Sequence, residues 1–155
     1  MNYQYLESPV GRLRLVSNGE SLTAIEWEAL QSGTPEGEEC SDVALEACAY
    51  QLQEYFAGQR RSFELPLSPA GTAFQQNVWS ALTDIPYGEV RSYRDIAESL
   101  DNPKAVRAVG AANGRNPLPI VVPCHRVIGS DGSLTGFAGG LEAKKILLRL
   151  EGSIE

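Results

Sequence analysis

Apolar and polar residues alternate with a period of two in two short stretches near the start of the chain, residues 13–16 and 22–27. The polar residues 17–20 between them are typical of a turn. Because successive side chains of a strand point to opposite faces, the pattern predicts two antiparallel strands with one buried face. A helix with apolar positions at helical spacing is predicted over residues 42–56. These apolar positions are Val43, Ala47, Tyr50 and Leu52.

The turn-rich residues 68–71, Ser-Pro-Ala-Gly, follow an extended segment at residues 63–67. Because proline and glycine interrupt regular structure, we place a boundary there and expect two domains, residues 1–70 and 71–155. Helical spacing predicts a helix at the start of the second domain and another at its end. Their inward-facing residues are predicted to be Phe74, Val78, Trp79 and Leu82 in the first, and Ile146, Leu147 and Leu150 in the second.

Two short helices are predicted between these, the first capped by Ser92 and the second over residues 104–113. The tight link Asp-Asn-Pro joins them, which is typical of a helix-turn-helix. The second helix is slim, because it holds several alanines and a glycine. Small side chains can allow close approach to DNA, and tight packing against a neighbouring helix explains them equally well.

The net charge of −7 argues at first sight against a nucleic-acid partner, because phosphate binding calls for clustered Lys and Arg. The acidity belongs to residues 1–70, which carry four basic and eleven acidic side chains, whereas residues 71–155 carry nine of each. Within residues 87–126 six basic side chains outnumber four acidic ones. This mild basic bias fits a DNA-binding surface, and it fits a solvated mixed-charge surface as well.

At 155 residues, 43% of them apolar and 21% charged, the chain has the composition of an ordinary globular protein. No apolar run approaches the roughly 20 residues that cross a bilayer, so we expect a cytoplasmic protein without a membrane partner. The three cysteines, Cys40, Cys48 and Cys124, are an odd number without the close pairs of a metal site. We therefore expect reduced thiols, no metal and no cofactor.

Cys124 stands in the run Pro-Cys-His-Arg-Val, directly before His125, the only histidine of the chain. A thiol becomes a strong nucleophile only as a thiolate, so it needs a base or a cation nearby. Adjacent side chains of an extended strand face opposite ways, so contact between the two requires a bridging water or a local bend. A buried, unreactive cysteine would give the same pair. The prolines before it and the glycine-rich loop after it favour a functional site.

This run resembles the active-site region of the methylated-DNA–protein-cysteine methyltransferases. The resemblance covers residues 71–152 and implies an α/β fold, in which a ribonuclease-H-like sheet-plus-helix domain precedes a mainly helical, winged helix-turn-helix-like domain. The further runs that carry it are Phe-Gln-Gln-Asn-Val-Trp (74–79), Ile-Pro-Tyr-Gly-Glu-Val (85–90), Arg-Ala-Val-Gly (107–110), Asn-Pro (116–117), Gly-Gly-Leu (139–141) and Leu-Glu-Gly (150–152).

The resemblance implies DNA repair by direct reversal of damage, in which an alkyl group moves from O6 of guanine, or O4 of thymine, onto Cys124. The product is a stable thioether, so each molecule would act once. The resemblance also implies that His125 takes the thiol proton through a water, that Glu151 orients the imidazole and that Asn116 braces the same network. Tyr93 would donate a hydrogen bond or proton toward N3 of the leaving guanine.

The expected partner is double-stranded DNA, bound by a monomer. The damaged nucleotide must leave the stack to be reached, and Arg107 corresponds to the family arginine that fills the vacated space. The slim helix would lie against the minor groove. The other residues expected at the DNA or the guanine pocket are Ala105, Gly110, Arg115, Val127, Phe137, Ala138 and Gly139.

Two of these pocket residues depart from the family pattern. Phe137 stands where many relatives carry tyrosine, and Ala138 stands where some carry serine. Those two hydroxyls are therefore missing, and only the aromatic face and backbone amides remain. We expect larger alkyl groups to be handled differently from the family's typical case.

Three other functions account for parts of the sequence. A related lesion-binding protein would recognise alkylated bases without transfer, but such proteins lack the reactive cysteine. A winged-helix transcription regulator would leave the Pro-Cys-His-Arg-Val run unexplained. A cysteine hydrolase needs only one histidine and a carboxylate in addition to the thiol. The combination of runs favours alkyl transfer.

Overall fold

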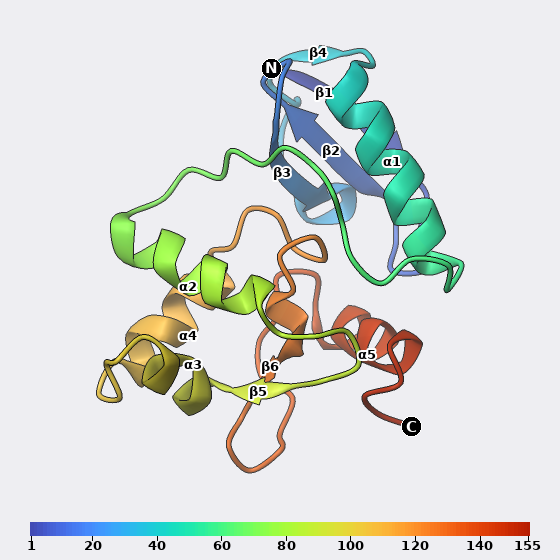
Figure 1. The fold of residues 1–155 in the computed structure, drawn as a ribbon. Helices are drawn as coiled ribbons and strands as arrows, with labels where there is room; N and C mark the ends of the chain where they lie inside the picture. Colours follow the sequence, from blue (N-terminus) through green and yellow to red (C-terminus); the bar gives the residue numbers. More distant parts are fainter. The chain divides into compact units, whose positions relative to one another are not determined.

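A four-stranded sheet in the order β3-β2-β1-β4 fills the first part of the computed structural model, which describes residues 1–155 (Figure 1). Its antiparallel strands are β1 (Asn2–Leu6), β2 (Leu13–Ser17) and β3 (Leu22–Trp27), and β4 (Glu38–Glu39) pairs in parallel with β1. The predicted pair of antiparallel strands is therefore confirmed. The predicted extended segment at 63–67 makes a single bridge, from Leu67 to Leu22.

The central strand β1 was not predicted. Its sequence, Asn-Tyr-Gln-Tyr-Leu, lacks the aliphatic alternation that marks β2 and β3. Tyr3 and Tyr5 pack edge to face with ring centroids 5.7 Å apart, and the guanidinium groups of Arg14 and Arg12 lie over them. Amphipathic side chains can therefore occupy a strand face without giving an apolar pattern.

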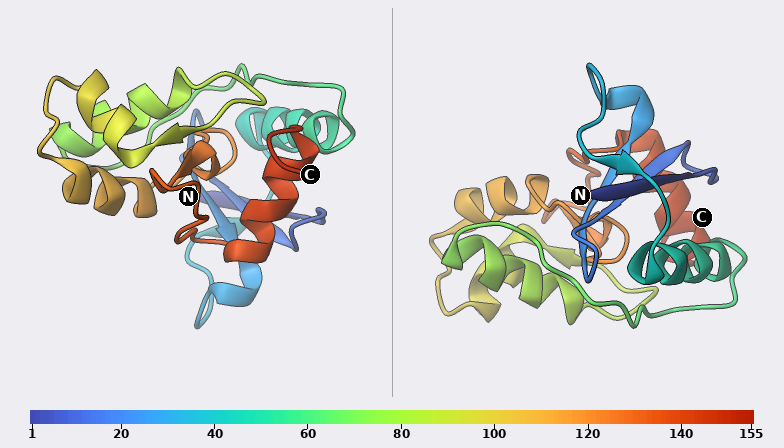
Figure 2. Two further views of the ribbon diagram at one scale, coloured as in Figure 1. Left: turned by 90° about the horizontal axis from the view of Figure 1, so that it is seen from below. Right: turned by 90° about the horizontal axis from the view of Figure 1, so that it is seen from above.

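Helix α1 (Val43–Phe56) packs on one face of this sheet (Figures 1 and 2). Its N-cap Asp42 accepts a hydrogen bond from the Leu45 amide at 2.8 Å and further bonds from Asn2 and Ser17 of the sheet. The predicted apolar face was partly wrong, since Val43 and Tyr50 are 82% and 62% exposed. Apolar residues occur on both sides of this helix, and the helix instead buries Ala44, Leu45, Cys48, Gln51, Leu52 and Tyr55.

The chain divides into two compact units, Met1–Ala70 and Gly71–Glu155. The second unit holds α2 (Ala73–Thr83), α3 (Tyr93–Ser99), α4 (Val106–Gly114) and α5 (Leu141–Leu150), as the helical spacing predicted. Helices α2, α3 and α4 contact one another (Figure 1). The Trp79 indole of α2 donates to the Ala112 carbonyl of α4 at 2.8 Å, which fixes these two helices together. No helix is long and apolar enough to span a membrane.

Two inward faces in this unit differ from the prediction. On α2, Val78, Trp79 and Leu82 are buried as expected, and Phe74 is half-buried. On α5, Leu147 is buried, but Ile146 and Leu150 are only half-buried. The residues that α5 buries are spaced three or four positions apart and are Ala143, Lys144, Leu147 and Leu148. This stripe has only Leu147 in common with the predicted one.

A two-residue parallel ladder joins parts of the second unit that are far apart in sequence. Strand β5 (Arg91–Ser92) pairs with β6 (Val127–Ile128), with Arg91 opposite Val127. Ser92 also caps α3, where it forms a capping box with Asp95. The ladder therefore holds the first turn of α3 beside the segment that follows the Pro-Cys-His-Arg run.

Candidate active site

A strained, buried loop leads to Cys124. Asn116 holds both ends of it, because its Oδ1 accepts from the Leu118 amide at 3.0 Å and its Nδ2 donates to the Val122 carbonyl at 2.9 Å. Between them Ile120 has a φ of 76°, a left-handed conformation that costs a β-branched residue free energy. Residues 118–123 are all buried.

Cys124 begins a 3₁₀ turn, Cys124–Arg126, where the chain bends instead of running extended. Pro123 has φ −80° and ψ 63°, and the Cys124 amide donates to the Val122 carbonyl at 2.8 Å. This is an inverse γ-turn, and proline is already fixed near the φ it requires. The local bend is therefore present, and it leaves Cys124 only 3% exposed.

The carboxylate of Glu151, directly after α5, binds two side chains of this turn. One oxygen, Oε2, lies 2.8 Å from His125 Nε2. Arg126 donates from Nε to Oε1 at 2.8 Å and from Nη2 to Oε2 at 3.0 Å, and its Nη1 donates to the Ile85 carbonyl at 2.8 Å. All three side chains are buried. The negative charge of Glu151 is thus balanced by a buried guanidinium, in the bidentate geometry that favours such pairs.

This carboxylate determines which nitrogen of His125 can act as a base. A carboxylate only accepts hydrogen bonds, so we assign the proton of the neutral ring to Nε2. Nδ1 is buried and has no hydrogen-bond partner. Burial lowers the pKa of His125, although Glu151 opposes this effect. The ring is therefore neutral at pH 7, and the Nδ1 lone pair is available for a proton.

Burial also keeps the thiol of Cys124 protonated. It raises the pKa of Cys124 to about 11, while a hydrogen bond from Asn116 and the positive charge of Lys144 act in the opposite direction. A thiolate at pH 7 therefore requires a base at the moment of reaction. Of the residues predicted as catalytic, Cys124, His125, Glu151 and Asn116 are gathered in this one buried cluster.

Tyr93, the fifth predicted catalytic residue, lies at the first turn of α3 and joins the cluster indirectly. Its hydroxyl is 2.8 Å from Thr135 Oγ1, and the Thr135 carbonyl accepts from Lys144 Nζ at 2.9 Å. The same ammonium donates to the Val127 carbonyl at 2.7 Å. The predicted pocket residue Val127 is fully buried, and in the loop that follows Thr135, Phe137 and Gly139 are half-buried and Ala138 is exposed.

The predicted DNA-contacting residues lie on α4 or at its ends, outside the cluster. Arg107 and Arg115 are exposed, and Ala105 and Gly110 are half-buried. A β-carbon on Gly110 would lie 3.8 Å from the Tyr93 ring, an ordinary contact, so packing alone does not require glycine there. The small residues of α4 lie in two different surroundings, since Ala112 is buried whereas Ala108 and Ala111 are exposed, as Arg107 is.

The exposed cations of residues 87–126 gather mainly at α4 and its ends. Arg126 is buried against Glu151, and Arg91 is paired with Glu89 at 3.0 Å. The four remaining cations are exposed on α3 and α4 or at the ends of α4: Arg94, Lys104, Arg107 and Arg115. Asp95, Glu98 and Asp101 are exposed as well, but all three precede α4, so the basic surface is that of α4 and its ends.

Three polar residues of the site were not singled out as site residues from the sequence. Asn113 donates to the Cys124 carbonyl at 3.4 Å, Arg126 holds Glu151, and Lys144 has no exposed surface. For Lys144 a signal exists, since Leu147 and Leu148, three and four residues later, place it on the apolar stripe of α5. Nothing in the local sequence marks Asn113.

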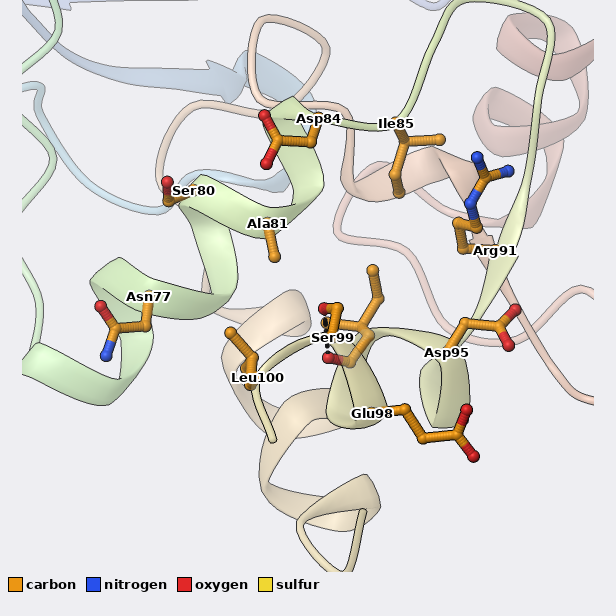
Figure 3. A pocket seen from close by; sticks show the side chains of 11 residues that line it. Asn77, Ser80, Ala81, Asp84, Ile85, Arg91, Asp95, Glu98, Ser99 and Leu100 are labelled. Atoms are coloured by element: carbon orange, nitrogen blue, oxygen red, sulfur yellow. Dashed lines mark hydrogen bonds between the residues drawn. The ribbon is translucent and has the colours of Figure 1, made fainter. Parts of the chain in front are cut away.

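A groove of about 660 Å³ lies elsewhere, between α2 and α3 (Figure 3). Asn77 and Ser80 line it from α2, and Asp95 and Glu98 line it from α3. No predicted site residue lines it. The groove therefore does not contain the Cys124 cluster and meets it only at Ile85, whose carbonyl accepts from Arg126.

Fold and site together define a class of protein, a helix-turn-helix protein with a buried cysteine–histidine–glutamate cluster. The family model "6-O-methylguanine DNA methyltransferase, DNA binding domain" matches residues 73–153, and that of the ribonuclease-like domain of the same family matches residues 1–69. The chain belongs to the 6-O-methylguanine DNA methyltransferase family. The family and the fold class predicted from the sequence are thereby confirmed.

Individual relatives match along nearly the whole chain. The methylated-DNA–protein-cysteine methyltransferase of Methanosarcina acetivorans is 47% identical, over 99% of this chain and 99% of its own length. The constitutive methylated-DNA–protein-cysteine methyltransferase of Bacillus subtilis is 49% identical, over 96% of this chain and 94% of its own. The crystal structure of Mycobacterium tuberculosis OGT in complex with DNA has a TM-score of 0.90 at 46% identity, and the match covers 99% of this chain and 94% of that one.

The depressed pKa of His125 predicts how stability depends on pH. The unfolded chain binds a proton near pH 6.5, whereas the folded chain resists it. The free energy of unfolding should therefore be constant above that pH and fall below it, by up to about 1.4 kcal/mol per pH unit. Denaturant unfolding between pH 5.5 and 7.5 measures this. His125→Gln, which removes the only histidine, should lose most of the slope. An equal slope in both proteins would contradict the assignment.

Proposed function

We propose that this protein repairs DNA by moving an alkyl group from O6 of guanine, or O4 of thymine, onto its own Cys124. The observation that carries the proposal is the buried His125–Glu151 pair directly beside the only cysteine of the second unit. The names of the relatives point the same way, since methylated-DNA–protein-cysteine methyltransferase describes a cysteine as the acceptor.

The chemical step begins with proton transfer. His125 Nδ1, which has no partner in the protein, takes the proton of Cys124 through a bridging water. Glu151 holds Nε2–H and stabilises the imidazolium that forms, and Asn116 holds the loop that leads to Cys124. The thiolate then attacks the alkyl carbon, so that the C–S bond forms as the bond from carbon to O6 breaks.

The electron pair of the broken bond passes to the guanine. Tyr93 stabilises this leaving group by donating from its hydroxyl toward N3, which requires the hydroxyl to exchange its present partner, Thr135. The product is a thioether, which neither His125 nor water cleaves under these conditions. Each molecule therefore acts once, and no cofactor is consumed.

Double-stranded DNA is bound by the second unit, residues 71–155, acting as a monomer. The exposed cations of α3 and α4 contact phosphates, and the small exposed residues of α4 let it approach the minor groove. The damaged base is flipped toward Cys124, at a cost of a few kcal/mol, and Arg107 fills the space it leaves. Val127 and residues 136–139 form the walls of the guanine pocket. Residues 1–70 form a separate ribonuclease-like domain.

Intact mass spectrometry tests the transfer directly. After incubation with a duplex oligonucleotide bearing O6-methylguanine, the protein should gain a single methyl group, and peptide mapping should locate it on Cys124. Cys124→Ser should gain none and should still bind the DNA. Repeated turnover would contradict the proposal, and so would lesion binding without modification, the behaviour of a lesion-recognition protein.

A comparison of two substrates tests the role of Arg107. Arg107→Ala should slow methyl transfer from duplex DNA by about tenfold or more, because the vacated space in the duplex is left unfilled, a loss of roughly 1.4 kcal/mol. Transfer from free O6-methylguanine should be unchanged, since no base pair has to open. Arg115→Ala is the matched control for a lost phosphate contact. Equal losses on both substrates in Arg107→Ala would contradict the flipping role.

A further inference from the structure

Lys144 is a buried cation that no carboxylate neutralises. Its side chain has no exposed surface, and its Nζ donates only to two neutral backbone carbonyls, those of Val127 and Thr135. The other buried cation of the site, Arg126, is paired with Glu151. Burying a charge without a counter-charge is costly, and burial accordingly lowers the pKa of Lys144. Such a charge at a nucleophile's site suggests a functional role.

The ammonium of Lys144 is bound to the segment that follows Cys124. Helix α5 contacts the turn that carries Cys124, and Lys144 Nζ donates to the carbonyl of Val127, three residues after Cys124. The positive charge placed there lowers the pKa of the Cys124 thiol, against the larger effect of burial. The other titratable groups at this turn are His125 and Arg126 on the turn itself and Glu151 at the end of α5. Because His125 is neutral and Arg126 balances Glu151, Lys144 supplies the single uncompensated positive charge of the cluster.

We propose that Lys144 is a positioning residue whose ammonium stabilises the thiolate of Cys124 during alkyl transfer. The inference rests on the proposed function and deepens it. When the thiol proton moves to His125, the new imidazolium faces Glu151, and the new thiolate has Lys144 as its counter-charge. Without Lys144 the only cation formed beside the thiolate would be the imidazolium, whose charge Glu151 already balances in part.

A purely structural role for Lys144 predicts a different result. The two carbonyls it binds belong to β6 and to the loop whose Thr135 bonds Tyr93. If Lys144 only held these segments together, its removal would loosen the site and make the buried Cys124 more accessible to a small reagent. If its charge stabilises the thiolate, its removal makes Cys124 less reactive. The two roles therefore change thiol reactivity in opposite directions.

The experiment measures alkylation of Cys124 by iodoacetamide at pH 8, located by peptide mapping, in the full chain without DNA. Lys144→Met should slow this reaction by about tenfold, since loss of an opposite charge raises the pKa of the thiol by about one unit or more. Lys144→Arg, which keeps the charge, should stay within about threefold of the wild type. Lys145→Met, one residue along the same helix and half-buried, is the matched control and should have no effect. Alkylation of the buried Cys48 reports any general loosening.

The inference is overturned if Lys144→Met is alkylated at the wild-type rate or faster, or if Lys144→Arg is as slow as Lys144→Met. If circular dichroism shows that Lys144→Met does not fold, Lys144→Gln is judged by the same criteria. Methyl transfer from duplex O6-methylguanine, measured in parallel, should slow by a similar factor in Lys144→Met. A wild-type protein that fails to accept methyl would refute the proposed function, while the iodoacetamide comparison would still decide the role of Lys144.

Discussion

The buried carboxylate of Glu151 is the interaction on which the site depends. It binds His125 and Arg126 together, and through Arg126 it connects the end of α5 to the Ile85 carbonyl after α2. An isolated carboxylate would be too costly to bury, but here a guanidinium balances it in a bidentate pair. Because Glu151 accepts from Nε2–H, the basic nitrogen of His125 is Nδ1, which has no hydrogen-bond partner. Glu151 therefore both pairs with Arg126 and orients His125 as a base.

The backbone around Cys124 is shaped to serve this pair. The γ-turn at Pro123 bends the chain, and Asn116 holds a loop that would otherwise release the strain at Ile120. Because hydrogen bonds from Asn116 hold this loop at both ends, the loop can keep Ile120 in a strained conformation that a free segment would not adopt. The β5–β6 ladder then sets Tyr93 beside the segment that follows Cys124. The site is thus assembled from three segments that are far apart in the chain.

The features that could be predicted from the sequence are those that depend on the spacing of residues a few positions apart. The helices of the second unit and the helix-turn-helix follow from apolar periodicity and capping residues, which act over a few positions. Strands β5 and β6 were missed because a two-residue ladder has no periodicity, and the buried face of α1 was misplaced because Val43 and Tyr50 are apolar but exposed. Glu151 was identified only through the family resemblance. Lys144 was missed because lysine side chains are usually exposed, although its spacing from Leu147 and Leu148 places it on the buried stripe of α5.

The central claim is that Glu151 holds His125 as a neutral base with its proton on Nε2. Nitrogen NMR of the single histidine, labelled in its ring, tests this most directly, since protonated and unprotonated ring nitrogens have distinct chemical shifts. The account predicts a neutral ring at pH 7, with a proton on Nε2 and none on Nδ1. In Glu151→Gln the ring should stay neutral, because burial still lowers its pKa, but its proton should no longer be fixed on Nε2. A proton on Nδ1, or a charged ring at pH 7 in the unmodified protein, would contradict it.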